Sequence, residues 1–426
     1  MPTGLDFGTT NSSIARVTRD SEVELVRFPS GAAFTESFRS LLYLERIREA
    51  SRSTIKSWSG PDGIAHYLEA DEKGRLIQSL KSFLSSRSLQ TTEIFGRQFH
   101  LEELVAKVLR DIRTQAETQF GSAMRRVVVG RPVRFVGAES EEDDLYAVKR
   151  LQTALHKAGF DEVSFEYEPV AAAFHYESGL DHDELILIGD FGGGTSDFSL
   201  LQVGPSQRKR DNRQRIVLGN EGLPLAGDAF DAKIIRHLVS PVLGAGTLLN
   251  SSGKLLPVPN WVYFKLERWH HLSFLRSRET LNMIQSVRKQ ALEPEKIAAL
   301  VYLVTHDLGY HLHRAVQRVK VGLSEAESVV FRFQDGEINL EAEVKRSEFE
   351  DWIAGELLDI EQKVAALLHK TGVEAKDVDR VFLTGGSSFV PAVRRIFESR
   401  FGAEKIRTGD EFTSVARGLA LSGSDS

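Results

Sequence analysis

The spacing of apolar and polar residues changes several times along the chain, between the period of strands and that of helices. Short apolar runs bounded by turn residues predict strands at residues 3–7, 13–17, 185–188, 198–203 and 381–383. Apolar residues at helical spacing predict helices at residues 101–118, 145–158 and 349–368. Helical positions also dominate residues 234–320, where we expect a helical insertion. This alternation indicates an α/β protein.

Three glycine-rich turns follow predicted strands. The first reads Asp6-Phe7-Gly8-Thr9-Thr10-Asn11-Ser12 and leads into another strand, which predicts a hairpin. The second, Asp190-Phe191-Gly192-Gly193-Gly194-Thr195-Ser196-Asp197, repeats the first. The third, Thr384-Gly385-Gly386-Ser387-Ser388, opens a helix over residues 391–400. The first two turns are too far apart for a solenoid, whose period is about 20 to 50 residues. Their separation indicates a duplicated lobe, and we place lobe I at residues 1–183 and lobe II at residues 184–426.

The residue types in these turns suit a ligand that carries phosphate. Glycine lets the backbone approach a ligand closely, so successive N–H groups can converge on phosphate oxygens. Thr9, Thr10 and Thr195 would add hydroxyl donors. Asp6 and Asp190 would supply carboxylates for Mg²⁺. A single turn of this kind is most often a plain hairpin, but the duplication favours a ligand-binding role.

Two other classes of phosphate-binding enzyme are excluded by their motifs. The sequence has no GxxxxGK[ST] segment, which excludes a P-loop nucleotidase. The Asp-Phe-Gly triplets occur without an HRD sequence, which excludes a protein kinase.

Four segments, in this order along the chain, resemble the nucleotide-binding domain of the Hsp70 chaperones. Residues 5–12 and 190–197 resemble its two phosphate loops, residues 167–173 its connecting element and residues 383–388 its adenosine loop. The resemblance implies an actin-like ATPase (ribonuclease H-like) fold, with two duplicated lobes around a nucleotide cleft. It places the helical insertion, about residues 234–320, in lobe II. We expect the last helix, about residues 412–426, to pack back on lobe I.

The resemblance also implies a site. Lys81 and Asp197 match residues that orient the attacking water, and Glu168 matches a glutamate that links the cleft to lobe movement. Thr195 would act with them in hydrolysis, while Asp6 and Asp190 would hold Mg²⁺. The implied ligands are ATP or ADP with Mg²⁺, and K⁺ as a further ion. The residues expected to contact the nucleotide are Gly8, Thr9, Thr10, Asn11, Gly192, Gly193, Gly194, Thr195, Gly227, Lys320, Ser324, Gly385, Gly386 and Ser387.

The chain departs from the family pattern in two respects. Val321 and Phe389 stand where the family usually has arginines around the adenosine, and losing both would remove about 1 to 2 kcal/mol of stacking. Residues 419–426 follow directly on the last nucleotide-domain helix, so we expect neither an interdomain linker nor a peptide-binding domain. In this second respect the chain is similar to the short, YegD-like members of the family.

Composition and charge limit the location and the partners. The chain has no cysteine, which excludes disulfides and thiol nucleophiles. It shows neither a secretory signal nor an apolar run of about 20 residues, so we expect a cytoplasmic protein without a membrane partner. The net charge of −6 disfavours nucleic acid. The basic residues 208–215 are typical of a solvated turn, with a phosphate-binding patch as the alternative.

These observations favour an Hsp70-like, chaperone-related protein in which slow, Mg²⁺-dependent ATP hydrolysis drives closure of the lobes. Two alternatives stay open. A nucleotide-gated interaction module would bind ATP without significant hydrolysis and present the insertion, with Trp261 and Trp269, to a protein partner or client. A sugar kinase of the same superfamily would need a base beside an acceptor pocket, which we cannot locate in the sequence.

Overall fold

The computed structural model describes residues 2–18, 20, 22–30, 33–49, 52–70, 74–177, 180–208, 217–268, 275–336, 338–408 and 414–423. The basic residues 209–215, Trp269 and the ends of the predicted last helix lie outside this set. The chain divides into two compact units. Unit 1 comprises Met1–Ala226, Asp359–Ser388 and Val393–Ser426, and unit 2 comprises Gly227–Leu358 and Phe389–Ala392.

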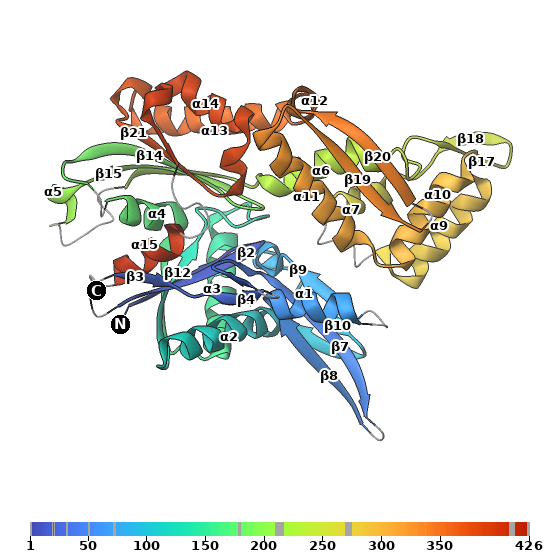
Figure 1. Ribbon diagram of the computed structural model, residues 1–426, viewed down its shortest axis with the longest axis horizontal. Coiled ribbons are helices and arrows are strands. Elements are labelled where there is room, and N and C mark those ends of the chain that lie inside the picture. Colours follow the sequence, from blue (N-terminus) through green and yellow to red (C-terminus); the bar gives the residue numbers. More distant parts are fainter. Residues whose placement is uncertain are drawn as a thin grey trace. The chain divides into compact units, whose positions relative to one another are not determined.

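The first large sheet of unit 1 has the strand order β13-β12-β1-β2-β3, with β6 paired to β2 (Figure 1). β1 forms an antiparallel hairpin with β2 and pairs in parallel with β12, which in turn pairs in parallel with β13. The strands are β1 (Thr3–Phe7), β2 (Asn11–Val17), β3 (Val23–Leu25), β6 (Phe38–Arg39), β12 (Arg126–Arg131) and β13 (Glu162–Tyr167).

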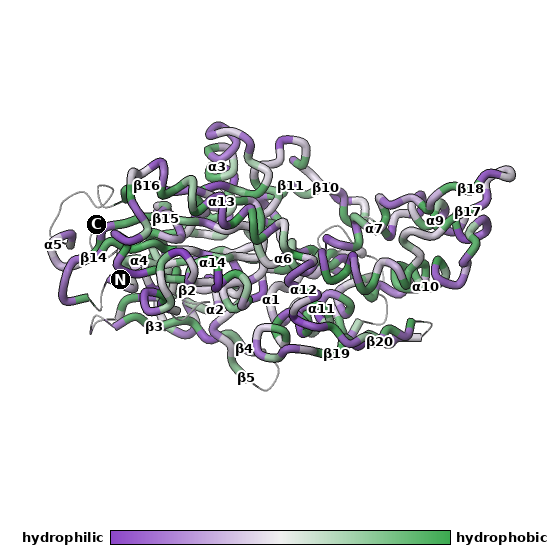
Figure 2. Tube along the Cα trace, turned by 90° about the horizontal axis from the view of Figure 1, so that it is seen from above, coloured by the Kyte–Doolittle hydropathy of each residue, from purple (hydrophilic) through white to green (hydrophobic). Residues whose placement is uncertain are grey.

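The second large sheet of unit 1 repeats this arrangement in the order β22-β21-β14-β15-β16. β14 forms an antiparallel hairpin with β15 and pairs in parallel with β21, which pairs in parallel with β22. Hydrophobic stretches follow β14 and β15 in Figure 2, and all but one of the β14 residues are buried. The strands are β14 (Glu184–Phe191), β15 (Ser196–Val203), β16 (Val217–Leu223), β21 (Arg380–Thr384) and β22 (Ile406–Thr408). The predicted boundary between the lobes, at residues 183 and 184, falls between the two large sheets of unit 1. The division into two lobes stays a prediction.

Helices pack on both sheets. α4 and α15 pack together, with α15 against β1 and β2 and α4 against β14 and β15, so the pair lies between the sheets. α2 and α3 pack together in a core shared with the first sheet. On α14, Phe397 lies 6.0 Å from Phe191 between ring centroids, on the second sheet. These helices are α2 (Leu101–Phe120), α3 (Glu141–Ala158), α4 (Glu168–Glu177), α13 (Ala354–Thr371), α14 (Pro391–Phe401) and α15 (Ser414–Ser422).

The sequence explains where α3 begins. Ser140 caps the helix by accepting a hydrogen bond from the Asp143 N–H, and the Asp143 carboxylate accepts the Ser140 N–H in return. The acidic residues of the first turn also face the positive end of the helix dipole.

Shorter elements complete unit 1. They are β4 (Phe28–Ser30), β5 (Ala33–Thr35), β7 (Leu41–Glu49), β8 (Arg52–Ser59), α1 (Gly60–Glu69), β9 (Arg75–Gln78), η1 (Leu80–Phe83), β10 (Thr91–Ile94), β11 (Arg97–His100), α5 (Pro205–Arg208), η5 (Ala375–Asp377), η6 (Gly386–Phe389, whose last residue belongs to unit 2) and η7 (Ala403–Lys405). β8, β7 and β9 form a small antiparallel sheet.

Unit 2 is mostly helical, as predicted for residues 234–320, but it also contains strands. The hairpin β17–β18 was not predicted, because its mostly exposed strands carry no regular alternation of buried and exposed residues. In this unit α11 packs against α6 and β19. The elements are α6 (Gly227–Ile234), the π-helix η3 (Ile235–Val239), β17 (Leu248–Ser251), β18 (Lys254–Pro257), α7 (Trp261–Leu266), α9 (Arg278–Gln290), α10 (Pro294–Thr305), α11 (Gly309–Glu325), β19 (Ser328–Asp335), β20 (Ile338–Lys345) and α12 (Arg346–Trp352). Every helix in the described part of the chain is too short or too polar to span a bilayer.

Candidate functional site

The first glycine-rich turn joins β1 to β2 and is closed by tight packing of its own backbone. A Cβ atom at Gly8 would lie 2.0 Å from the Asn11 carbonyl oxygen, so no larger residue fits there. The Ser40 N–H donates to the Thr10 carbonyl at 2.9 Å, and Arg39 donates to the Asn11 side chain at 3.1 Å. The turn is therefore held by β6 and the residue that follows it.

The second glycine-rich turn joins β14 to β15 and lies close to the first. It is closed by a hydrogen bond from the Gly192 N–H to the Thr195 carbonyl at 2.9 Å. A Cβ atom at Gly194 would lie 3.9 Å from Thr9 Oγ1 and 4.0 Å from Ser82 Oγ. The fold thus brings the duplicated turns, far apart in sequence, together within unit 1.

The third glycine-rich turn follows β21 and lies against the second. Gly385 has a φ of +84°, and a Cβ atom there would lie 2.1 Å from the Phe191 carbonyl oxygen, so both conformation and space require glycine. The Ser388 N–H and hydroxyl both donate to the Gly385 carbonyl, and Ser387 is buried. The parallel pairing of β14 with β21, which sets Asp190 opposite Thr384, places this turn.

Charged side chains gather beneath the turns. Lys81, on η1, lies 2.5 Å from Glu168 Oε1 at the first residue of α4, and both side chains are buried. Asp190 and Asp197 stand opposite each other on β14 and β15 and are 9% and 1% exposed. Asp6 on β1 is partly buried. We call Asp6, Lys81, Glu168, Asp190 and Asp197 the charge cluster.

The charge cluster carries more negative than positive groups, and its pKa values reflect this. Burial, and then the charges of Glu168 and Asp197, raise the pKa of Asp190 to about 8. Burial, followed by Glu168, raises the pKa of Asp197 to about 8. Burial also raises the pKa of Asp6 well above its usual range, assisted by Glu168 and Asp190. Burial lowers the pKa of Lys81, but Glu168 and Asp6 outweigh it and the net change is upward. A further cation would relieve this repulsion.

Two buried oxygen atoms near the turns are left without a partner. Asp197 Oδ1 accepts the Val133 N–H at 3.0 Å, but Asp197 Oδ2 is buried without a hydrogen-bond partner. Thr10 Oγ1 is also buried without a hydrogen-bond partner. Because unpaired buried polar atoms are costly, such atoms suit a site that is completed by a ligand.

The residues present fit a hydrated magnesium nucleotide better than a bare metal centre. No three of the described histidine, aspartate and glutamate side chains are arranged to ligate one ion. Mg²⁺ usually keeps several waters and binds one or two carboxylates together with substrate phosphates. Asp6 and Asp190 could supply those carboxylates, and the glycine turns could supply N–H donors for phosphate.

The remaining predicted residues belong to unit 2. Lys320 on α11 forms an ion pair with Asp231 at 2.8 Å and donates to the carbonyl of Gly227, the first residue of α6. The Ser324 hydroxyl donates to the Lys320 carbonyl at 3.3 Å. A role of these residues in nucleotide binding stays a prediction. Val321 and Phe389, the departures from the family pattern, are 60% and 52% exposed.

The structure adds contacts that the sequence analysis missed. Val133 contributes a backbone N–H, and any residue except proline at that position could donate it, so no sequence signal existed. Ser82 directly follows Lys81, and only the approach of Gly194 brings it to the turns. Arg39 could have been suspected as a charged residue in a strand, but its contact with Asn11 depends on the pairing of β6 with β2.

Comparisons with known proteins agree with the resemblance of the motifs. A family model described as Hsp70 protein matches residues 68–245 and 306–424, more than half of the chain. The chain is 25% identical over 425 residues to the chaperone protein DnaK of Thermosipho melanesiensis. It is also 25% identical over 425 residues to the chaperone protein DnaK of Thermosipho africanus. Each alignment covers 98% of this chain and 58% of the relative, so the chain spans somewhat more than half the length of these relatives.

Proposed function

Because this chain belongs to the Hsp70 family, we propose that it binds ATP with Mg²⁺ at the glycine turns and hydrolyses it slowly. The fold of the family is the actin-like ATPase fold, and the matching strand orders of the two sheets agree with the predicted duplication. The expected output of the cycle is closure and reopening of the lobes, in a chaperone-related role.

The observation that carries the proposal is the charge cluster at the point where the two duplicated turns approach each other. One ammonium group faces four carboxylates, and two of these have pKa values of about 8. Such an imbalance costs stability unless a cation is bound. Strongly shifted carboxylates beside glycine-rich turns support a site for a magnesium nucleotide.

Different residues of the chain would bind the phosphates and orient the attacking water. The N–H groups of Gly8, Gly193 and Gly194, with the hydroxyl of Thr195, would hold phosphate oxygens. Lys81, oriented by Glu168, would donate a hydrogen bond to the attacking water. Asp197, held by the Val133 N–H, would accept a hydrogen bond from the same water through its unpaired oxygen. Mg²⁺, when bound, would neutralise charge on the phosphates.

Further parts of the proposal rest on the family rather than on the cluster. K⁺ is a candidate for a second ion, because the negative excess would favour it. A protein partner or client would contact the insertion, where Trp261 and Phe264 are 40% and 54% exposed. We place the protein in the cytoplasm.

The test is a calorimetric titration of Mg-ATP, with phosphate release followed on the same samples. Asp190→Asn keeps the shape of the side chain and removes its charge. It should lower turnover by about 100-fold or more, the cost of removing one preorganised electrostatic group. The matched control is Glu166→Gln, because burial also raises the pKa of Glu166 and its carboxylate accepts a hydrogen bond from the adjacent Tyr167 N–H. The control should keep wild-type turnover.

Each outcome separates the candidate functions. Loss of turnover in Asp190→Asn alone would support the ATPase. Binding of ATP by the wild type without phosphate release would favour the nucleotide-gated interaction module. Phosphate transfer to a sugar, tested by adding hexoses, would favour the sugar kinase. Unchanged turnover in Asp190→Asn would contradict the proposed mechanism.

A further inference from the structure

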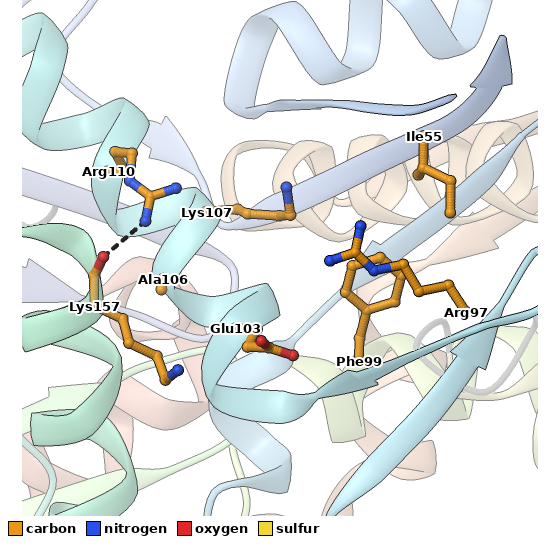
Figure 3. A pocket seen from close by; sticks show the side chains of 8 residues that line it. All are labelled: Ile55, Arg97, Phe99, Glu103, Ala106, Lys107, Arg110 and Lys157. Carbon is orange, nitrogen blue, oxygen red and sulfur yellow. Dashed lines mark hydrogen bonds between the residues drawn. The ribbon is translucent and has the colours of Figure 1, made fainter. Parts of the chain in front are cut away.

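A pocket in unit 1 lies between β8, β11, α2 and the C-terminal end of α3 (Figure 3). Its volume is about 250 Å³. Phe99 and Ala106, which are 4% and 2% exposed, give it an apolar base. We call it the basic pocket, and its lining residues are Ile55, Arg97, Phe99, Glu103, Ala106, Lys107, Arg110 and Lys157.

The lining carries a strong excess of positive charge. Arg97, Lys107, Arg110 and Lys157 face one carboxylate, that of Glu103. Glu103 already accepts the His100 N–H at 2.9 Å, where it caps α2. Within the described ranges, none of the four cationic side chains forms an ion pair. The positive charge of the pocket lining contrasts with the net charge of the whole chain, which is −6.

Neutral contacts fix the cationic groups in place. Arg110 donates to the Lys157 carbonyl at 2.7 Å, and Lys107 donates to Ser57 Oγ at 3.0 Å. Arg97 lies over the Phe99 ring, 4.9 Å from its centroid, and Figure 3 shows Lys107 and Glu103 on the facing side of the pocket. These contacts orient the side chains and leave their charge uncompensated.

The charges also act on one another. The pKa of Lys107 is lowered, first by burial and then by Arg110, while Asp111 and Glu103 oppose the shift and Arg97 adds to it. Like charges held this close repel one another, and a bound anion would remove the repulsion. The pocket is therefore arranged for a ligand of negative charge.

We propose that the basic pocket binds a small anion of the phosphate type with at least two negative charges. Two guanidinium groups and two ammonium groups suit phosphate oxygens, because a guanidinium can donate two parallel hydrogen bonds. The small volume suits a compact ligand rather than a protein surface. Nucleic acid would need a longer basic stripe to follow its backbone, and the negative net charge of the chain disfavours it.

The probe is inorganic pyrophosphate, titrated calorimetrically into the full chain with EDTA and without nucleotide. EDTA removes the Mg²⁺ that the proposed site at the glycine turns would need to hold a phosphate group. The double variant Arg97→Gln/Lys107→Gln should weaken binding by at least about ten-fold, because charged hydrogen bonds are lost. Lys157→Gln removes an exposed cation with little risk to folding and should weaken binding in the same direction.

The control variant is Lys149→Gln/Arg125→Gln, which removes two exposed positive charges elsewhere in unit 1. It should change the affinity by less than about two-fold, because exposed charges are screened. No binding to the wild type, or equal weakening in the two double variants, would overturn the proposal. A second titration uses citrate, and citrate binding as tight as pyrophosphate binding would assign the pocket to carboxylates and overturn the phosphate assignment.

Discussion

Two lysines of this chain are paired with buried carboxylates, one in each unit, and their surroundings differ in charge balance. In unit 2, Lys320 pairs with Asp231 and donates to the Gly227 carbonyl, so one negative charge balances one positive charge. In unit 1, Lys81 shares its surroundings with Glu168 and the three aspartates of the charge cluster. The pair in unit 2 is balanced in charge and joins α11 to α6, although Asp231 Oδ2 has no hydrogen-bond partner. Under the proposed function, the excess negative charge of the cluster is neutralised by another cation.

The largest expected effect comes from removing one carboxylate from each surrounding. Asp231→Asn leaves the Lys320 ammonium buried without its counter-charge, which should lower the free energy of unfolding by about 3–5 kcal/mol. Asp190→Asn removes a carboxyl group that is ionised in the unfolded chain at pH 7.5 but is held mostly neutral in the folded chain, so it should raise the free energy of unfolding of the nucleotide-free protein by at least about 1 kcal/mol. Urea unfolding at pH 7.5 without Mg²⁺ measures both.

The opposite signs are the decisive part of this comparison. If Asp190→Asn also destabilised the nucleotide-free chain, the charge cluster would be a structural network and the imbalance would carry no information on ligands. Added Mg-ATP sharpens the test, because ligand binding should stabilise the wild type and not Asp190→Asn. Asp231→Asn serves as the control for losing a buried aspartate in general.

The fold could be predicted from the sequence to the extent that its signals are local or repeated. The turns at residues 8–11 and 192–195 were recognisable because glycine, threonine and aspartate are adjacent in sequence and occur twice. The hairpin β17–β18 was not predicted, since Leu255 and Leu256 are neighbours in one strand and both are exposed, which breaks the expected alternation. Short exposed strands carry little periodic signal.

The site could be predicted in its residue types but not in its contacts. Lys81 and Glu168 were identified by resemblance, and the ion pair between them depends on how η1 and α4 pack. The Val133 N–H could not be predicted, because a backbone donor has no residue signature. A contact of Lys320 with the nucleoside stays a prediction, and its ion pair with Asp231 could not be predicted because it depends on the packing of α11 on α6. Charge balance is a property of three-dimensional neighbours, which sequence spacing does not reveal.

A smaller effect tests whether the interior of unit 2 around His313 is closed to solvent. His313 is buried on α11, with Nε2 3.1 Å from the Leu266 carbonyl, and burial lowers its pKa to about 4 although Asp231 opposes the shift and Lys320 adds to it. Below pH 6.5, His313 is protonated in the unfolded chain but stays neutral in the folded chain until the pH approaches 4. The free energy of unfolding should therefore fall by about 1–3 kcal/mol between pH 6.5 and pH 4, with no contribution from His313 above pH 6.5.

His313→Gln isolates this contribution, because glutamine can donate to the Leu266 carbonyl and does not titrate. The difference in the free energy of unfolding between wild type and variant should change with pH below 6.5 and stay constant above it. Hydrogen exchange along α11 would assign the change to unit 2. A difference independent of pH would mean that His313 is open to solvent and protonates in the folded state.

The smallest expected effect tests whether residue 321 contributes to nucleoside affinity, as the resemblance implies. Val321 is 60% exposed, so an arginine there disturbs no core, and it restores the residue type that the family usually places against adenine. Stacking of one arginine at an exposed site contributes about 0.5–1 kcal/mol, so Val321→Arg should lower the Kd for Mg-ATP by about two- to five-fold. The control is Val330→Arg, an exposed valine on β19 of the same unit, which should leave the Kd unchanged. Turnover at saturating ATP should be the same in both variants, because the charge cluster that would orient the water lies in unit 1. A change in saturated turnover with Val321→Arg would contradict a role of residue 321 in nucleoside affinity alone.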